Sequence, residues 1–460
     1  MPLSPSVIKS LKYIVGPDNC LDSKEDMACY AYDTTPDFKL PDAVVFPKTA
    51  QEVSAILDLA NQKRFFVTPR GAGTGMTGGS VPARGGVVLA MTRFDRILEI
   101  DIDNMVAIVQ PGVITGRFQK AVEEKGLFYP PDPSSAAVST LGGNAAECAG
   151  GPRAVKYGVT RDYVLGLEVV LPTGEIVKTG VKTAKGVAGL DLTRLIIGSE
   201  GILGVITQLT LRLLPQPEAV GTLTAVFDTI GGAACAVCSI MRSGIIPRTL
   251  EYMDQAAVLC VENHLHAGLP VDAGAVLLIE VDGSTAEVSG VSARLASLLA
   301  AENAREVRTA GQGIEADLLW KARKTISPAL FTYAPDKLNE DIVVPKSRIP
   351  DMVLRVAELS RKTGLTMVSF GHAGDGNIHV NIMYDRADAD QREAAQKAVD
   401  AVFDYTLALG GTITGEHGVG TTKAAYLKHE ISPPALALMK RIKTAFDPKG
   451  ILNPGKIFDG

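Results

Sequence analysis

The sequence lacks the features that would place it in a membrane or on nucleic acid. No apolar run approaches the ~18 residues that a membrane-spanning helix needs, and the N-terminus has no basic start followed by an apolar stretch. The net charge of -5 leaves no basic excess for binding nucleic acid or an anionic membrane. We therefore expect neither a signal peptide nor a membrane span, and a cytoplasmic protein that reaches a membrane only through a partner.

Cysteine is scarce, and its spacing is not typical of a disulfide framework. The six cysteines are Cys20, Cys29, Cys148, Cys235, Cys238 and Cys260. The one Cys-x-x-Cys, formed by Cys235 and Cys238, lacks the second pair that a zinc or iron–sulfur site needs. It falls in residues 231–242, an apolar stretch predicted to be helical, so we interpret both as small buried core residues. The cysteines indicate a reducing compartment and supply no iron–sulfur centre.

The remaining composition is that of a globular protein with more than one domain. At 460 residues the chain is too long for a single compact core, and two or three domains are expected. Hydrophobic residues make up 46% and charged residues 21%, which is enough apolar material for such cores. The 46 glycines cluster in short runs, a pattern that indicates backbone wrapped closely around a ligand.

The first glycine run follows a predicted strand, residues 65–68, and contains a literal G-x-G-x-x-G at Gly73, Gly75 and Gly78. A Rossmann fingerprint must open a helix directly after its strand. Here the run leads into another predicted strand, residues 87–90, so we reject that motif. Backbone N–H groups can cradle a pyrophosphate without a helix, and we favour this interpretation over a solvent-exposed glycine loop.

Two more glycine-rich blocks lie further along, at residues 139–152 and 197–204, on either side of a predicted hairpin over residues 167–179. Three glycine-rich loops between strands predict one large ligand lying along a sheet. After a boundary near residues 214–217 the chain alternates between strands and helices. That alternation predicts an antiparallel sheet with helices covering one face.

Basic residues occur at two places in this second part. Arg323 lies in a predicted helix, residues 314–325, and Lys337 lies in a loop before a predicted strand, residues 342–345. Such residues usually form solvated surface. In a site that binds an acid they would instead hold a carboxylate, and arginine would do so with two parallel hydrogen bonds.

Histidines flank a glycine-rich turn in residues 371–381. His372 precedes the turn, and His379 and Asn381 lie on one side of a predicted strand whose other side faces the core. Imidazoles in such a setting can hold a divalent metal, although an ordinary hairpin is the alternative. Glu416 and His417 form an adjacent polar pair between glycines, which in isolation is as easily a helix-capping turn.

Residues 40–215 resemble the FAD-binding domain of vanillyl-alcohol-oxidase-type flavoproteins, in which loops and not a Rossmann helix hold the FAD. The fold implied for the whole chain is α+β: an FAD-binding domain over 1–216, a substrate-binding cap over 217–410, and a segment over 411–460 that returns to the first domain. Only Cys148 could stand at a flavin-linking position, so we expect non-covalent FAD. The resemblance implies cofactor contacts at Pro69, Arg70, Gly71, Ala72, Gly73, Thr74, Gly75, Pro133, Ser134, Ser139, Gly142, Gly143, Asn144, Gly150, Gly151, Tyr157, Gly158, Glu200, Gly201, Ile206 and Asn453.

Residues 217–456 resemble the cap domain of FAD-linked D-2-hydroxyacid dehydrogenases, a family that includes D-lactate dehydrogenase, the glycolate oxidase flavin subunit and D-2-hydroxyglutarate dehydrogenase. The resemblance implies that His372, His379 and Glu416 bind a divalent metal, either Zn, Mn or Fe. It also implies that His417 is the catalytic base. Arg323, Lys337 and Asn381 are the expected substrate-binding residues.

The chemistry explains the need for these residue types. A metal that binds the substrate hydroxyl lowers its pKa, and a histidine can accept the proton near neutral pH. We therefore expect metal-assisted oxidation of a D-2-hydroxyacid, with hydride transfer to flavin N5. The expected electron acceptor is electron-transfer flavoprotein, an iron–sulfur subunit or a quinone. A homodimer is the oligomer we consider. The alternatives are a flavin oxidase of another alcohol that uses oxygen, and a flavin electron-transfer subunit of a larger complex.

Overall fold

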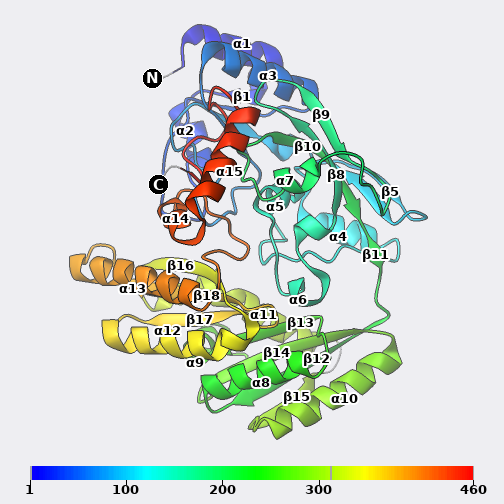
Figure 1. Cartoon of the computed structure of the whole chain (residues 1–460), viewed down its shortest axis with the longest axis vertical. Coiled ribbons are helices and arrows are strands. Elements are labelled where there is room, and N and C mark those ends of the chain that lie inside the picture. Colours follow the sequence, from blue (N-terminus) through cyan, green and yellow to red (C-terminus); the bar gives the residue numbers. More distant parts are fainter. Residues whose placement is uncertain (1–2, 311–312, 459–460) are drawn as a thin grey trace. The chain divides into compact units, whose positions relative to one another are not determined.

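The computed structural model describes residues 3–310 and 313–458, which form two compact units (Figure 1). Unit 1 contains the residues up to Gly150, the segment Val159–Gln216 and the residues from Glu416 onward. Unit 2 contains Pro217–Gly415 and the short segment Gly151–Gly158. That short segment lies inside the range expected for the FAD-binding domain, and the chain therefore passes between the units four times.

Unit 1 is built on two sheets and a short ribbon. Its strands are β1 (Cys20–Leu21), β2 (Ala43–Val45), β3 (Val67–Arg70), β4 (Val87–Ala90), β5 (Ile97–Asp101), β6 (Val106–Val109), β7 (Leu127–Phe128), β8 (Val164–Val170), β9 (Ile176–Gly180), β10 (Val205–Arg212) and β11 (Leu214–Pro215). The first sheet has the order β1-β2-β4-β3, with β2, β4 and β3 parallel. The second sheet is antiparallel, in the order β5-β6-β10-β8-β9, and β7 pairs with β11.

The helices of unit 1 cover these sheets. They are α1 (Pro5–Val15), α2 (Lys24–Met27), α3 (Ala50–Lys63), α4 (Thr115–Glu123), α5 (Leu141–Glu147), α7 (Leu192–Ile196), α14 (Leu427–Glu430) and α15 (Pro433–Phe446). The start of α3 follows from the sequence, because the Thr49 hydroxyl accepts a hydrogen bond from the backbone N–H of Glu52. The C-terminal segment joins the first sheet at Leu452, which forms a parallel bridge with Val67.

The second glycine block differs from the loop that the sequence predicts, since α5 runs through its centre. Thr140 caps this helix by accepting a hydrogen bond from the backbone N–H of Gly143 at 3.2 Å. A Cβ at Gly142 would overlap Pro111, so the glycine here permits close packing of a helix and not a flexible loop. By contrast, no helix follows the first glycine run, as expected: it connects β3 directly to β4.

Unit 2 is a seven-stranded antiparallel sheet with helices, in agreement with the predicted alternation. Its strands are β12 (Ala219–Phe227), β13 (Thr249–Asp254), β14 (Ala275–Gly283), β15 (Glu306–Ala310), β16 (Asp336–Val343), β17 (Met367–His372) and β18 (Asn377–Tyr384). Its helices are α6 (Ala154–Tyr157), α8 (Ile230–Arg242), α9 (Gln255–Leu265), α10 (Thr285–Ala301), α11 (Ile314–Ala329), α12 (Ile349–Thr363) and α13 (Ala389–Ala408). The strand order is β15-β12-β14-β13-β17-β18-β16.

Helices cover both faces of this sheet, so the expectation of a single covered face is wrong. On β12, Val226 belongs to a core cluster with buried residues of α9 and α11. Gly221 points to the opposite face of the same strand, where a Cβ would contact Val288 of α10. Figure 1 shows α8, α12 and α13 in front of the sheet, and α8 and α13 both contact α12. Every residue of β18 is consequently buried, including the side predicted to be open.

His372 is the last residue of β17 and precedes the turn. Two other placements differ from the sequence-based expectations. Lys337 lies within β16 and not in a loop before a strand. Cys235 is exposed and Cys238 is half-buried, because α8 buries its alanine and valine face instead. The expectation that both are buried is wrong.

Among the described residues, no helix is long and apolar enough to cross a membrane.

Candidate functional site

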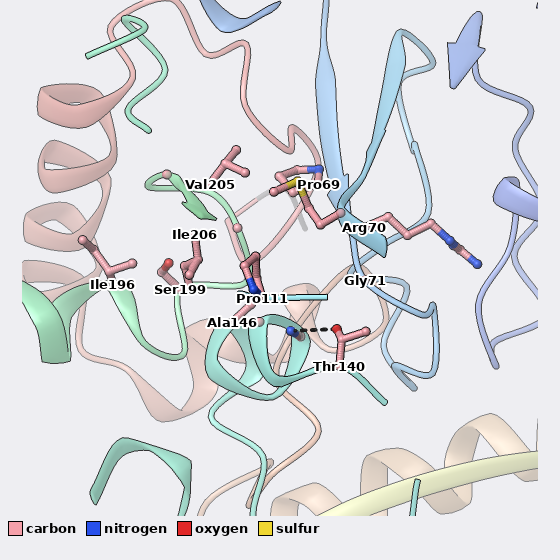
Figure 2. A pocket seen from close by; sticks show the side chains of 15 residues that line it. Pro69, Arg70, Gly71, Pro111, Thr140, Ala146, Ile196, Ser199, Val205 and Ile206 are labelled. Carbon is pink, nitrogen blue, oxygen red and sulfur yellow. Dashed lines mark hydrogen bonds between the residues drawn. The ribbon is translucent and has the colours of Figure 1, made fainter. Parts of the chain in front are cut away.

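Unit 1 contains a cavity where the glycine blocks meet (Figure 2). Its walls come from the end of β3, from α5, and from the segment between α7 and β10. The lining residues are Pro69, Arg70, Gly71, Met91, Pro111, Thr140, Gly142, Gly143, Ala146, Ile196, Ser199, Gly201, Gly204, Val205 and Ile206. The three glycine-rich blocks thus line one common cavity, as a single large ligand requires.

Part of this lining was expected from the sequence. The expected residues are Pro69, Arg70, Gly71, Gly142, Gly143, Gly201 and Ile206. Sequence reasoning missed the others, which are Met91, Pro111, Thr140, Ala146, Ile196, Ser199, Gly204 and Val205. Thr140, Ala146, Ser199 and Gly204 lie within the two glycine-rich blocks already identified from the sequence. The other four missed residues are apolar and lie outside those blocks, so only the fold brings them to the cavity. A largely apolar wall with a few polar groups is typical of cofactor sites.

Close contacts between the blocks explain why glycines stand in the wall. A Cβ at Gly71 would overlap Oγ1 of Thr140, and one at Gly201 would lie 3.4 Å from Cγ of Pro69. A side chain at Gly71 would therefore separate the end of β3 from α5, while Gly201 has a positive φ of 69° that favours glycine. The two glycines thus support the close approach of β3 to α5 and the turn of the third block.

Arg70 lines the cavity with its backbone, while its guanidinium turns away (Figure 2). Nη1 donates to Oγ of Ser80 at 3.2 Å, and a Cβ at Gly73 would overlap the guanidinium. Burial lowers the pKa of Arg70, and the nearby Asp33 opposes that shift. The Arg70 side chain thus stabilises the glycine run, and the backbone is what reaches the cavity.

Several other residues expected at the cofactor hold the surrounding framework. Asn144 is buried and its Nδ2 donates to Oγ1 of Thr115 at 2.8 Å, and Oγ of Ser139 lies 3.0 Å from the same oxygen. Asn453 donates to the carbonyl oxygens of Gly79 and Glu200. Unit 1 also holds Ala72, Gly73, Thr74, Gly75, Pro133, Ser134 and Gly150, which lie outside the lining. Unit 2 holds Gly151, Tyr157 and Gly158.

Glu200 fixes the loop that carries His417. Its carboxylate accepts hydrogen bonds from the backbone N–H groups of Val419 and Gly420 at 2.7 and 2.6 Å. Oγ1 of Thr77 donates to the carbonyl oxygen of His417 at 3.2 Å. Burial raises the pKa of Glu147 well above its usual range, and the negative charge of the nearby Glu200 adds to that rise. A raised pKa favours the neutral form of Glu147, and a neutral carboxyl can lie beside Glu200 without charge repulsion.

In unit 2, polar side chains share the sheet face that α9 and α11 cover. Directly opposed residues on neighbouring strands point to the same side. His379 on β18 lies opposite Asp341 on β16, and Asn381 lies opposite Asn339. On the other side of β18, β17 places His372 on the same face as Phe370, which lies opposite His379. The His372 and His379 rings lie 5.2 Å apart between centroids and are nearly perpendicular.

A buried carboxylate joins His372 to the predicted substrate-binding arginine. Oε1 of Glu251, on β13, lies 2.6 Å from Nδ1 of His372. Arg323 of α11 donates to Oε2 of Glu251 from Nε at 2.8 Å, and its Nη2 lies 2.6 Å from the same oxygen. Burial would raise the pKa of Glu251, but the charges and hydrogen bonds of His372 and Arg323 outweigh it and lower the pKa. Glu251 is missing from the sequence-based prediction, although a glutamate in the apolar strand 249–253 was a usable signal.

Lys337 is a half-buried cation on the same face of the sheet. Its ammonium donates to the carbonyl oxygen and the hydroxyl of Ser327, and it lies 5.0 Å from the ring centre of Phe331. Burial lowers its pKa to about 8. Among the residues that the structure describes, no carboxylate forms a salt bridge with Lys337. A half-buried ammonium whose hydrogen-bond partners are all neutral is a suitable place for an anionic ligand.

Asp341 is a second buried carboxylate that sequence reasoning missed. It lies 3.8 Å from Nδ1 of His379, and it accepts hydrogen bonds from Nδ2 of Asn377 and from the backbone N–H of Gly415. Glu416 and His417 follow Gly415 directly in the chain. Lys337, Asn339 and Asp341 alternate along β16, and this alternation could have revealed the strand.

The donor set in unit 2 fits a divalent metal. Two imidazoles lie edge to face and two buried carboxylates contact them, and neutral imidazoles are common ligands for zinc and other transition metals. Because Glu251 engages Nδ1 of His372, a metal bound by this residue would take Nε2. The amide oxygens of Asn339 and Asn381 are buried and accept no hydrogen bond within the described part of the chain. They leave acceptors for a hydroxyl or a bound water.

Two family models match successive parts of the chain. The family described as FAD binding domain matches residues 41–180, and that described as FAD linked oxidases, C-terminal domain, matches residues 216–457. Glycolate oxidase subunit GlcD of Bacillus subtilis (strain 168) is 46% identical over 457 residues, covering 99% of this chain and 97% of that protein. D-lactate dehydrogenase of Anaerostipes hadrus is 36% identical, covering 91% and 89%.

The fold is that of vanillyl-alcohol-oxidase-type flavoproteins. The structure of p-cresol methylhydroxylase with substrate bound superimposes with a TM-score of 0.83 at 17% identity, covering 99% of this chain and 96% of that one. At this identity the likeness concerns the fold alone. It agrees with an FAD-binding domain in which loops, and no Rossmann helix, surround the cavity.

Proposed function

This chain belongs to the family of FAD-linked oxidoreductases that includes the glycolate oxidase flavin subunit and D-lactate dehydrogenases, and on that premise we propose that it oxidises a D-2-hydroxyacid to the 2-oxoacid. The names of the relatives support this class of substrate. Glycolate, D-lactate and D-2-hydroxyglutarate are the candidate substrates.

The observation that carries the proposal is the half-buried ammonium of Lys337. It lies on the sheet face that also holds Arg323 and the two histidines, and its hydrogen-bond acceptors belong to Ser327 and carry no charge. A substrate carboxylate bound there would give the Lys337 ammonium a partner of opposite charge. Arginine and lysine are the usual partners of carboxylates. We therefore assign substrate binding to Arg323 and Lys337, with Asn381 as an acceptor for a hydroxyl or water.

His417 is the proposed base, which accepts the hydroxyl proton as the carbon loses hydride. A histidine suits this step because an imidazole can accept a proton near neutral pH. His372, His379 and Glu416 are the proposed metal ligands, and a divalent ion would supply a Lewis acid that lowers the pKa of the hydroxyl. Bound FAD would supply the hydride acceptor. The residues proposed to hold FAD are those lining the cavity of unit 1.

Electrons must then leave the flavin for another molecule. The six cysteines are free and give no iron–sulfur ligand pattern within the chain. Electron-transfer flavoprotein, an iron–sulfur subunit or a quinone is the proposed acceptor. The name of the Bacillus subtilis relative, a subunit, supports a larger complex as the second candidate for this role.

Anaerobic flavin bleaching with a panel of D- and L-2-hydroxyacids tests this function. We expect the yellow protein to bleach with at least one of glycolate, D-lactate and D-2-hydroxyglutarate, and to leave the L-isomers unreacted. Bleaching by simple alcohols and not by any 2-hydroxyacid would favour an oxidase of another alcohol. No bleaching until a partner protein is added would favour the subunit function.

A further inference from the structure

Glu251 has an unusual setting for a charged residue. It lies in the middle strand region of unit 2, within β13, and its side chain is fully buried at 0% exposure. A buried carboxylate is costly unless charged partners and hydrogen bonds compensate it. Both of its oxygens are engaged: Oε1 contacts Nδ1 of His372, and Oε2 contacts two nitrogens of Arg323. One carboxylate therefore connects the proposed metal ligand to the proposed substrate clamp.

We propose that Glu251 is a positioning residue that holds both His372 and Arg323, and thereby couples metal binding to binding of the substrate carboxylate. This inference rests on the proposed function. It concerns a residue that contacts neither the metal nor the substrate. Its action is through the orientation of two side chains that do.

The effect on His372 follows from the tautomer. A carboxylate at Nδ1 requires the proton on that nitrogen, which makes Nε2 the lone-pair donor and fixes the plane of the ring. The edge-to-face arrangement with the His379 ring depends on that plane. Without Glu251 the ring could rotate or change tautomer, and metal affinity would fall.

The effect on Arg323 follows from the geometry of the guanidinium. Oε2 of Glu251 contacts both Nε and Nη2 of Arg323. The centre of the Phe370 ring lies 4.7 Å from the guanidinium carbon. These contacts fix the plane of the group, so its outer N–H groups point in one direction. A substitution of Arg323 removes the ion pair with Glu251, and the Glu251 carboxylate can then change its position and its hydrogen bond to His372. Coupling in both directions is then required by linkage.

Metal affinity measured on the full-length flavoprotein tests the proposal. Zinc affinity would be obtained by competition with a chelating dye, for the wild type, Glu251→Gln and Glu251→Ala. Loss of the hydrogen-bond partner of a metal-binding histidine typically weakens metal binding by about 10- to 100-fold. We expect Glu251→Gln to weaken zinc binding less than Glu251→Ala does, because glutamine keeps an acceptor oxygen. The flavin absorption spectrum and the melting temperature verify that each variant folds.

Arg323→Gln provides the sharper measurement, because Arg323 is not a proposed metal ligand. We expect this variant to change zinc affinity in the wild-type background and to leave it unchanged in the Glu251→Gln background. Glu280→Gln is the matched control, since Glu280 is a largely buried glutamate on the adjacent β14 that contacts Arg248 and Trp320. Its zinc affinity should equal that of the wild type.

Unchanged zinc affinity in Glu251→Gln, or equal effects of Arg323→Gln in both backgrounds, would overturn the proposal. His372→Ala separates this failure from failure of the proposed function. If His372→Ala also binds zinc like the wild type, the metal site itself is wrongly assigned. If only His372→Ala loses affinity, the metal site stands and the role of Glu251 does not.

Discussion

Lys337 is the residue whose charge state most directly affects the proposed substrate site. Burial lowers its pKa to about 8, so the ammonium loses its proton as the pH rises through that value. A carboxylate binds the charged form, and we therefore expect substrate affinity to be full below pH 8 and to fall above it. Measurement of KM from pH 6.5 to 9.5 tests this, and a KM independent of pH would contradict it.

Variants of Lys337 separate charge from packing. Lys337→Gln removes the charge, and loss of a charge-assisted hydrogen bond worth about 1.5–3 kcal/mol predicts a KM roughly 10- to 100-fold higher. Lys337→Arg keeps the charge at every accessible pH, so the KM of this variant should not rise above pH 8. Equal KM values for the Lys337→Gln variant and the wild type would remove Lys337 from the substrate site.

His417 is the proposed base, and its substitution should separate chemistry from cofactor binding. His417→Ala should purify with FAD, since the contact of His417 with Thr77 is through its backbone oxygen. It should bleach at least about 100-fold more slowly, because general base catalysis typically contributes 10²- to 10⁴-fold. His429→Ala, a change at an exposed histidine, is the control and should behave as the wild type. Full-rate bleaching of His417→Ala would exclude its role as base.

At the scale of elements, the strands and helices with clear periodicity were predictable from the sequence. The first glycine run was predictable too, because a strand and not a helix follows it. The first half of β16 was missed, because its polar residues were interpreted as a loop although Lys337, Asn339 and Asp341 alternate. Asp341 is buried, and Lys337 and Asn339 are half-buried, because β18 pairs with β16 along its whole length.

The same reason accounts for what sequence reasoning missed at the site. His372 and His379 are close in sequence, and their motif together with the family resemblance predicted a metal site. Glu251 lies 121 positions from His372, and Asp341 lies on a different strand from His379, so only the strand order brings each pair together. The apolar residues of the cavity that lie outside the glycine-rich blocks have no local pattern that predicts their position. Periodicity and glycine runs therefore predict elements and loops, while partners from other strands require the fold.

The glycines at the cavity allow a direct test at this scale. Gly142→Ala should reduce the FAD content of the purified protein, because its Cβ would overlap Pro111 and displace the wall formed by α5. Gly290→Ala is the control: a Cβ there meets nothing within 4 Å on α10, and alanine should stabilise that helix by about 0.5–1 kcal/mol. Full FAD content in the Gly142→Ala variant would contradict this, because it would show that α5 can shift without loss of FAD binding.

For the whole molecule, we predict slow reaction with oxygen. A dehydrogenase that passes electrons to a partner protein or a quinone should release little hydrogen peroxide after reduction by substrate. Stopped-flow reoxidation in air-saturated buffer, with a peroxide assay, measures this. Rapid reoxidation with one peroxide per flavin would instead support a flavin oxidase.

The central claim is that a divalent metal and FAD together oxidise a 2-hydroxyacid, and anaerobic bleaching before and after metal removal tests it most directly. We predict that the chelator-treated protein stays yellow when mixed with the substrate that bleaches the untreated protein, and that added zinc or manganese restores bleaching with one 2-oxoacid formed per flavin. Bleaching at an unchanged rate after verified metal removal would contradict the claim.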